Sequence, residues 1–385
     1  MIAHAGSASL RVTDIKTANY AAEPGELVQC DASGGSFTIG LPANPGVNDR
    51  IGVKLLEATG SNSVTVGRNG NAIEGEAGDL VLSAAGDYHE LQYDGAGQWL
   101  ALSESAPPSA TVRFQPPNGR LTLTSGTPIM SGNVTGASTI YFTPYEGNTV
   151  YLFDGDAWLH HDLNEVSLAL SGLTSGKNYD VFLYSNGGTP AMELSAPWVN
   201  DSTRSDALAT QDGVPVKSGA PSRLHIGTIR TTGTNTTEFS FIEGTGPKRA
   251  FVWNRYNRVL VPITASDTAG TYNYTTAVFR KARNSDNSKV EFILGAFRDE
   301  VRIDAIHRSF NASGAFRVTG VGLNTASAPT SDRSLTSVSA GTTMPSHASR
   351  QLAAGYHFAH VLEYSQAVGT TTWNEPTILE VHLWC

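Results

Sequence analysis

The sequence has few charged residues and very few cysteines. Only 16% of its 385 residues are Asp, Glu, Lys or Arg, against about a quarter in ordinary globular domains. The two cysteines, Cys30 and Cys385, form no metal-binding spacing with each other or with histidine. We therefore expect neither a disulfide scaffold nor a structural zinc site, and the cysteine content fits folding in a reducing cytoplasm.

Long apolar runs are also missing, and we expect no signal peptide. No stretch approaches the ~20 apolar residues that cross a bilayer as a helix, and residues 1–6 lack the basic start and apolar core of a signal peptide. We expect no membrane insertion. The net charge of −9 and the absence of a basic stripe disfavour nucleic-acid binding.

Turn formers and alternating apolar residues are abundant. The sequence has 39 glycines and 40% hydrophobic residues, a composition that favours β structure over disorder. Phe37, Ile39 and Leu41 alternate with small or polar residues, as do Val64 and Val66, and this is the period of a half-buried strand. We expect an all-β fold of tandem β-sandwich or jelly-roll-like modules.

Three modules are predicted, spanning residues 1–105, 109–245 and 246–385. Pro107 and Pro108 form a stiff linker after the first, and a glycine-rich turn ending at Pro247 precedes the third. One short helix is expected within 202–213.

The third module resembles a sandwich or jelly roll in its number of short strands. Its strands are expected at 258–263, 274–280, 289–297, 300–308, 315–322, 356–363 and 377–384. The long loop 324–349 is expected to bind a ligand or to clasp a neighbouring subunit.

One hairpin pattern occurs twice. An aromatic residue, an Asp-Gly turn and a tryptophan follow one another at 93–99 and again at 153–158. Asp-Gly is a strong hairpin turn signal. We predict that Trp99 and Trp158 each pack across their own hairpin on the aromatic partner.

Two charged clusters are candidates for a catalytic or metal-binding site. The first is Asp154, Asp156, His160, His161 and Asp162. Adjacent histidines on a strand face opposite sides, and aspartates beside a turn glycine have an ordinary structural use, so no metal and no catalytic residue is predicted there. The second is the run 298–304, in which Glu300, Arg302 and Asp304 would share one strand face and form cross-strand ion pairs.

A cluster of aromatic and basic residues suits sugar binding. Aromatic faces beside arginine stack on sugar rings and attract anionic groups. The candidate glycan-binding residues are Arg255, Tyr256, Arg258 and Trp373. The alternative is that Trp253 and Tyr256 pack at a module junction. No cofactor is expected.

Charge is distributed unevenly along the chain. Residues 1–108 carry a net charge of −8, residues 109–245 carry −5 and residues 246–385 carry +4. An acidic beginning and a basic end suggest different partners, with attraction of anionic glycan to the basic part. Solvated surface charge without a partner is the alternative.

The N-terminal part resembles a module found near the N-termini of bacteriophage tail and head fibres. The matching segments are Phe37-Thr38-Ile39-Gly40-Leu41-Pro42, Asp49-Arg50-Ile51, Val64-Thr65-Val66-Gly67-Arg68-Asn69-Gly70, Ile73-Glu74-Gly75 and Tyr93-Asp94-Gly95 with Trp99. From Ser109 onward the sequence is similar to fibre and fibre-head segments through less specific motifs.

This resemblance implies a non-catalytic fibre or spike subunit of a virion, assembled in the host cytoplasm as a homotrimer. Its N-terminal module would attach to other virion proteins (portal, tail or capsid), and its C-terminal module would bind host-surface polysaccharide. Trimer formation would also cover strand edges. The alternatives are a capsid or collar decoration protein and a polysaccharide-degrading tailspike, although the rung periodicity of a long β-helix is missing.

Overall fold

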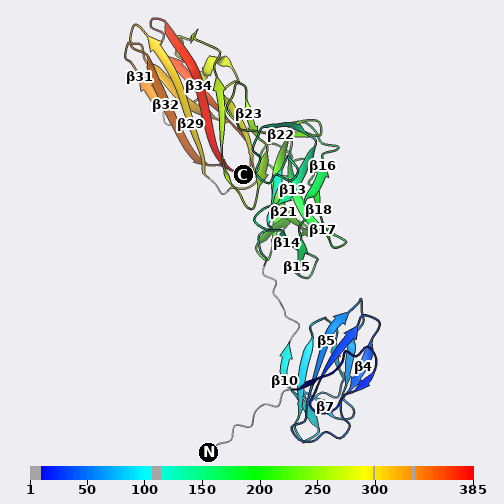
Figure 1. The fold of residues 1–385 in the computed structure, drawn as a ribbon. Helices are drawn as coiled ribbons and strands as arrows, with labels where there is room; N and C mark the ends of the chain where they lie inside the picture. The colour runs from blue at the N-terminus through cyan, green and yellow to red at the C-terminus, as the bar shows by residue number, and fades with distance from the viewer. Residues whose placement is uncertain (1–9, 106–113, 298–299, 331–333) are drawn as a thin grey trace, which may run out of the picture. The chain divides into compact units, whose positions relative to one another are not determined.

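A computed structural model describes residues 10–105, 114–297, 300–330 and 334–385. It confirms the all-β fold: the regular elements of these residues are strands, apart from the short 3-10 helix Ala282–Asn284. The chain divides into two compact units, unit 1 (Met1–Arg113) and unit 2 (Phe114–Cys385), each visible in Figure 1. Among the described residues, no helix has the length and apolar character needed to cross a membrane.

Unit 1 is built from two sheets. The six-stranded sheet has the order β1 (Arg11–Val12), β3 (Glu26–Ala32), β5 (Arg50–Ala58), β9 (Tyr88–Tyr93), β10 (Gln98–Ser105) and β7 (Ala72–Ile73). The four-stranded sheet has the order β2 (Tyr20–Ala21), β4 (Phe37–Gly40), β6 (Val64–Gly67) and β8 (Leu80–Leu82). Alternate residues such as Val28, Ile39 and Val66 are fully buried in one core, as the sequence alternation predicts.

The repeated hairpin is confirmed. Trp99 pairs with Tyr93 in register and Trp158 pairs with Phe153, with ring centroids 5.5 Å apart in both hairpins. Both tryptophans are buried. In each turn the aspartate accepts hydrogen bonds from backbone N–H groups of the following residues, and these bonds lower the pKa of Asp94 and Asp154.

Unit 2 contains a large sheet of fourteen strands. Its main path is β18 (Thr189–Leu194), β17 (Asn178–Asn186), β21 (Ala220–Gly233), β22 (Thr236–Ser240), β23 (Lys248–Ala250), β28 (Lys289–Leu294), β33 (Gly355–Ser365), β30 (Arg317–Leu323) and β31 (Ser334–Thr336). Beside this path lie β12 (Val134–Ala137), β19 (Leu208–Gln211), β20 (Val214–Lys217), β24 (Val252–Asn254) and β27 (Arg280–Lys281).

Three smaller sheets complete unit 2. The first has the order β25 (Leu260–Asp267), β34 (Thr371–Trp384), β29 (Glu300–Asn311) and β32 (Thr342–Gln351), with β26 (Tyr272–Asn273) beside β34. In Figure 1, β29, β32 and β34 run alongside one another. The others are β11 (Gly119–Thr122), β13 (Thr139–Pro144) and β16 (Val166–Ala169), and the pair β14 (Thr149–Phe153) and β15 (Trp158–Asp162).

The predicted boundary at 245/246 does not separate compact units. Strand β22 pairs with β23 across it, with Phe239 opposite Ala250 and Ser240 opposite Arg249. One hydrophobic core extends from Leu121 to Cys385. The predicted middle and C-terminal modules therefore form a single unit, because strands from both sides of the glycine-proline turn share one sheet.

Two other local predictions are wrong. The expected helix at 202–213 does not form: residues 202–207 are irregular, and residues 208–213 form β19 and the turn of the hairpin β19–β20. The turn residues Asp212 and Gly213 both have positive φ, as Asp-Gly turns require. The expected strand 274–280 does not form: β26 ends just before it, at Asn273, and β27 begins at its last residue, Arg280.

The expected loop 324–349 contains strand structure. It includes β31 and most of β32, and β32 pairs with β29 along ten positions. The inward residues of β32 include Met344, Ser346 and Ala348. Small and polar side chains on the buried face give little hydrophobic alternation, so this strand carried a weak sequence signal.

Candidate functional site

The structure does not offer Trp373 to a ligand. This tryptophan lies in strand β34, not in a loop, and is fully buried. Its ring stacks on His307 at 4.6 Å, and its Nε1 donates to the backbone oxygen of Tyr274 at 3.1 Å. The prediction that Trp373 is available to stack on a sugar is therefore wrong.

The other three candidates lie together directly after β24. The Nε atom of Arg255 donates to Nδ1 of His225 at 2.6 Å. The guanidinium groups of Arg255 and Arg258 each lie 5.7 Å from the buried ring of Trp253, and the ring of Tyr256 lies 6.0 Å from that of Phe114. These contacts agree with the alternative prediction, in which the aromatic residues of this cluster pack against neighbouring side chains instead of facing a ligand.

Trp373 and the cluster at 255–258 do not form one site. Val259 exchanges backbone hydrogen bonds with Cys385, so the cluster lies beside the end of β34. Trp373 lies twelve residues before Cys385 in the chain, which corresponds to roughly 40 Å along an extended strand.

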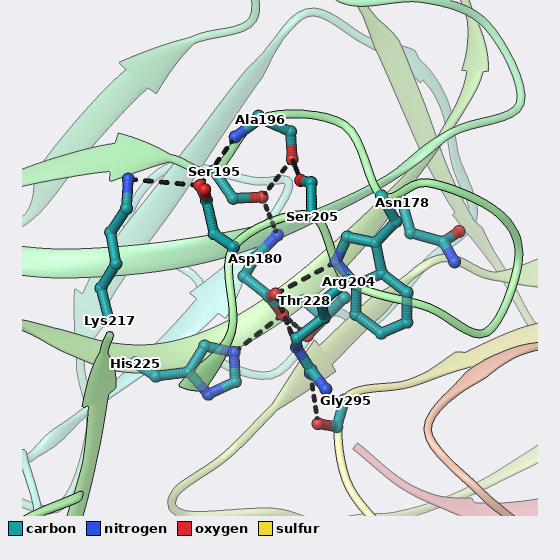
Figure 2. A network of polar contacts seen from close by, with 12 residues as sticks. Asn178, Asp180, Ser195, Ala196, Arg204, Ser205, Lys217, His225, Thr228 and Gly295 are labelled. Atoms are coloured by element: carbon teal, nitrogen blue, oxygen red, sulfur yellow. Dashed lines mark hydrogen bonds and ion pairs between the residues drawn. The ribbon is translucent and has the colours of Figure 1, made fainter. Parts of the chain in front are cut away.

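A buried polar network surrounds Asp180 (Figure 2). Its carboxylate accepts hydrogen bonds from Nε and Nη2 of Arg204 at 2.7 and 3.1 Å and from Oγ1 of Thr228 at 2.8 Å. Trp198 Nε1 also donates to it, at 3.0 Å. Burial by itself would raise the pKa of Asp180, but hydrogen bonds from His225 and Arg204 and the charge of Arg204 hold it below its usual range.

The histidine of this network has both ring nitrogens occupied. His225 Nε2 lies 3.0 Å from Asp180 Oδ1, and Nδ1 accepts from Arg255, so the proton resides on Nε2. Burial lowers the pKa of His225 to about 4. A general base needs a nitrogen that reaches substrate, and this fully buried ring has neither access nor a vacant nitrogen. The network is structural.

A second buried network involves Glu363. Its side chain is fully buried, accepts from Arg280 Nε at 2.7 Å and is hydrogen bonded to the hydroxyl of Tyr272. Burial raises the pKa of Glu363 to about 7 despite Arg280. Burial also lowers the pKa of neighbouring His307 to about 3. These titrating groups are enclosed in the core, so they support the sheet packing around Trp373.

An open groove lies on the outer face of the β25–β34–β29–β32 sheet. Its volume is about 560 Å³. The lining residues are Leu260, Glu300, Arg302, Asp304, His347, Ser349, His382 and Trp384. They share one face because β29, β32 and β34 alternate between buried and outward residues. We refer to this surface as the outer-face groove.

On the β29–β32 side, charged residues form a chain of contacts. Arg302 Nε donates to Asp304 Oδ2 at 2.8 Å, and His347 Nδ1 lies 2.9 Å from Asp304 Oδ1. Ser349 donates from its hydroxyl to Glu300. Partial burial tends to raise the pKa of Asp304, but hydrogen bonds with His347 and Arg302 lower it overall, which favours a carboxylate in this position.

The β34 side adds a third carboxylate, that of Glu380. Glu380 lies directly opposite Asp304 in register. Its Oε1 lies 2.6 Å from His382 Nε2, and its Oε2 accepts from Thr264 Oγ1 at 3.2 Å. Two carboxylate–histidine pairs therefore lie side by side on neighbouring strands.

One end of the groove is apolar. Trp384 is 43% exposed and pairs in register with Leu260, which is 49% exposed. An exposed indole next to hydrogen-bonding groups is suited to stack on a sugar ring while polar groups orient its hydroxyls.

The sequence anticipated part of this groove. The prediction that Glu300, Arg302 and Asp304 share one strand face is confirmed. The ion pair of Arg302 with Asp304 runs along the same strand, and the cross-strand contacts are made by His347 and Ser349 instead. The prediction missed Glu380, His382 and Trp384, although their outward positions follow from alternation with buried Leu379, Val381 and Leu383. These three outward residues could have been identified from the expected strand 377–384 by deciding which of its alternate residues are buried. The prediction also missed His347, which lay in the expected loop.

The cluster at 154–162 is dispersed. Asp154 accepts a backbone hydrogen bond within its own turn. His161 Nδ1 lies 3.0 Å from the backbone oxygen of Gly188, and the His160 ring packs against that of Tyr151. Within the described ranges, no group of three or more His, Cys, Asp or Glu side chains is placed to hold a metal ion.

Comparisons with known proteins give no family. No family model matches the sequence, and no curated protein matches it. Among solved structures, the chain is similar to BuGH86 in complex with neoagarooctaose, at 9% identity and a TM-score of 0.20, over 65% of this chain and 33% of the other.

Two further likenesses are equally distant. An infectious bursal disease virus Gx strain structure matches at 12% identity and a TM-score of 0.23, over 66% of this chain and 70% of the other. The Cry4Aa toxin of Bacillus thuringiensis matches at 8% identity and a TM-score of 0.21, over 65% of this chain and 51% of the other. At these TM-scores the likeness identifies no function.

Proposed function

We propose that this chain is a structural fibre or spike subunit of a bacteriophage or phage-like particle that attaches the particle to host-surface glycan. Unit 1 attaches to other virion proteins, and the outer-face groove of unit 2 binds the glycan without catalysis. The N-terminal motifs support the virion assignment by their resemblance to fibre modules. The single observation that carries the binding role is the groove, with an exposed tryptophan beside paired carboxylates, histidines and Arg302.

The groove replaces the residues first expected to bind glycan. Trp373 is enclosed, and Arg255 is engaged by His225. Trp384 offers the accessible ring. The polar side chains at the two preceding outward positions of β34, and their cross-strand partners on the same sheet face, offer hydrogen bonds. Shallow sites that combine a ring platform with a few fixed polar groups are suited to sugar recognition.

Binding to oligosaccharides tests the attachment role. We expect the full chain to bind members of an array of neutral, amino-bearing and acidic oligosaccharides. Trp384→Ala should weaken binding roughly tenfold, because an aromatic contact worth about 1.5 kcal/mol corresponds to that factor. The control is Leu159→Ala, since Leu159 is 44% exposed on β15, outside the groove. Absence of binding to every oligosaccharide would favour a mechanical decoration role.

The homotrimer is part of the proposal. Phe316, Val338 and Val368 are 39%, 53% and 49% exposed. They belong to adjoining segments, because Gln366 N donates to Phe316 O and Arg317 Nη2 donates to Val338 O. Exposed apolar side chains that gather on one part of a surface favour subunit contact.

We expect a solution mass near three times the chain mass of 40.8 kDa by light scattering after gel filtration. Introducing charge with Val338→Lys or Val368→Lys should lower this mass, since a lysine buried at an interface is costly. Val199→Lys is the control, at a position that is 64% exposed in another segment. A clean monomer of the parent chain contradicts the trimer.

A further inference from the structure

We infer that the outer-face groove selects glycans that carry a basic amino group over neutral and acidic glycans. This inference rests on the proposed function and names the ligand class of the same groove. It departs from the expectation, based on the net charge of residues 246–385, that the basic end of the chain attracts anionic glycan.

Local charge in the groove is opposite to the charge of its surrounding sequence. The groove lining includes two carboxylates, those of Glu300 and Asp304, and one guanidinium, that of Arg302. The carboxylate of Glu380 lies outside this lining but on the same sheet face, directly opposite Asp304. Exposed charges beyond about 8 Å are strongly screened at physiological ionic strength. A bound ligand therefore experiences these carboxylates more strongly than distant basic residues.

The two central carboxylates lie close to each other. Asp304 and Glu380 are directly opposed on antiparallel strands, where Cβ atoms lie about 4.5–5.5 Å apart and like charges repel. An ammonium group placed between them interacts favourably with both. A ligand carboxylate or sulfate in that place would add a further negative charge.

Both carboxylates retain capacity for a ligand. Asp304 is engaged by Arg302 and His347, and Glu380 by His382 and Thr264. Their side chains remain 30% and 38% exposed, and an ionised carboxylate offers about four acceptor positions. The lowered pKa of Asp304 is consistent with a charged acceptor.

The spacing of the groove suits an oligosaccharide. Trp384 and Glu380 lie on the same face of β34, four residues apart, which is about 13 Å along the strand. One ring can stack on the indole while the amino group of another sugar residue reaches Asp304 and Glu380. The indole face itself attracts cations, so both ends of the groove favour the same charge.

Titration calorimetry of the full chain with three oligosaccharides of equal length tests the inference. The probes are a glucosamine oligosaccharide, its N-acetylated neutral counterpart and a glucuronate-containing oligosaccharide. We expect affinity to decrease in that order, with roughly tenfold between the first and the second. Glu380→Gln and Asp304→Asn should each remove most of this difference, because they weaken binding of the glucosamine probe more than binding of the neutral probe.

A matched control separates groove binding from general attraction to an acidic chain. Glu57→Gln removes the same charge from an exposed position in unit 1 and should change no affinity. Tightest binding of the neutral or acidic probe, dependent on Trp384, overturns the ligand class and leaves the attachment role standing. An unchanged preference for glucosamine in Glu380→Gln and Asp304→Asn also overturns it. Failure of all three probes to bind counts against the attachment role itself.

Discussion

Replacing Asp180 with alanine is expected to lower the free energy of unfolding of unit 2 by about 3–5 kcal/mol, because removal of one partner from a buried ion pair leaves the other charge uncompensated. Asp180 is fully buried and accepts from Arg204, Thr228 and Trp198, with His225 as a further partner. Arg204 also donates to the backbone oxygen of Gly295 at 2.7 Å, but this neutral acceptor does not compensate the guanidinium charge. Urea unfolding followed by circular dichroism measures the loss.

The matched control for this variant is Asp201→Ala. Asp201 also pairs with an arginine, Arg230, at 2.8 Å, but its side chain is 59% exposed. The Arg230 side chain is only 11% exposed, but it keeps Asn178 Oδ1 as an acceptor at 2.8 Å when Asp201 is removed. Pairs with an exposed carboxylate contribute about 0–1 kcal/mol, so this variant should lose far less stability than Asp180→Ala. Equal losses for Asp180→Ala and Asp201→Ala would mean that burial of the network does not determine its contribution.

The second large effect is expected at the repeated hairpins. Trp99→Ala and Trp158→Ala should each lower unfolding free energy by about 3–5 kcal/mol, the usual loss for truncating a buried tryptophan. Trp99 is fully buried in unit 1, and Trp158 is 5% exposed in unit 2 and donates from Nε1 to Asp212. The same urea experiment applies to both.

Trp384→Ala serves as the comparison for these two variants, since its ring is 43% exposed. Its loss should stay below about 1 kcal/mol, because surface substitutions rarely exceed ±0.5 kcal/mol. A loss of only a few tenths of a kcal/mol for Trp99→Ala or Trp158→Ala would show that cross-hairpin packing contributes little in these hairpins.

Strong alternation made much of the fold predictable from sequence. Where large apolar residues alternate with polar ones, as at Phe37 and Ile39 or at Val64 and Val66, strands form as expected. Asp-Gly turns also located both tryptophan hairpins. These are local signals, set by the pleat of a strand and by backbone conformation at the turn.

Structural features that depend on pairing with distant parts of the chain could not be predicted from the sequence. Strand β32 fills its inward positions partly with Ser346 and Ala348, and only pairing with β29 identifies it as a strand. The turn at Gly246 and Pro247 has the composition of a domain boundary, yet β23 returns to pair with β22. Long-range pairing of this kind leaves no local mark in the sequence.

Predicting the candidate site required knowing which alternate residues of β34 face outward. Trp373 and Trp384 lie on the same strand, eleven residues apart, and therefore on opposite faces of it. Trp373 is enclosed between layers and Trp384 faces outward. A shift of one residue in phase exchanges the two faces, so composition alone selected the wrong tryptophan.

The pairing of β22 with β23 restricts how genes for such chains can recombine. A crossover between Ser240 and Lys248 would bring together halves from two parents whose strand edges had never been matched. Hydrophobic residues on both sides would also have to fit a core inherited from the other parent. Exchange of residues 114–385 as a whole preserves all of these contacts. A change of ligand preference by gene exchange would therefore replace the groove together with the entire unit, whereas point substitutions on the outer sheet face could change it alone.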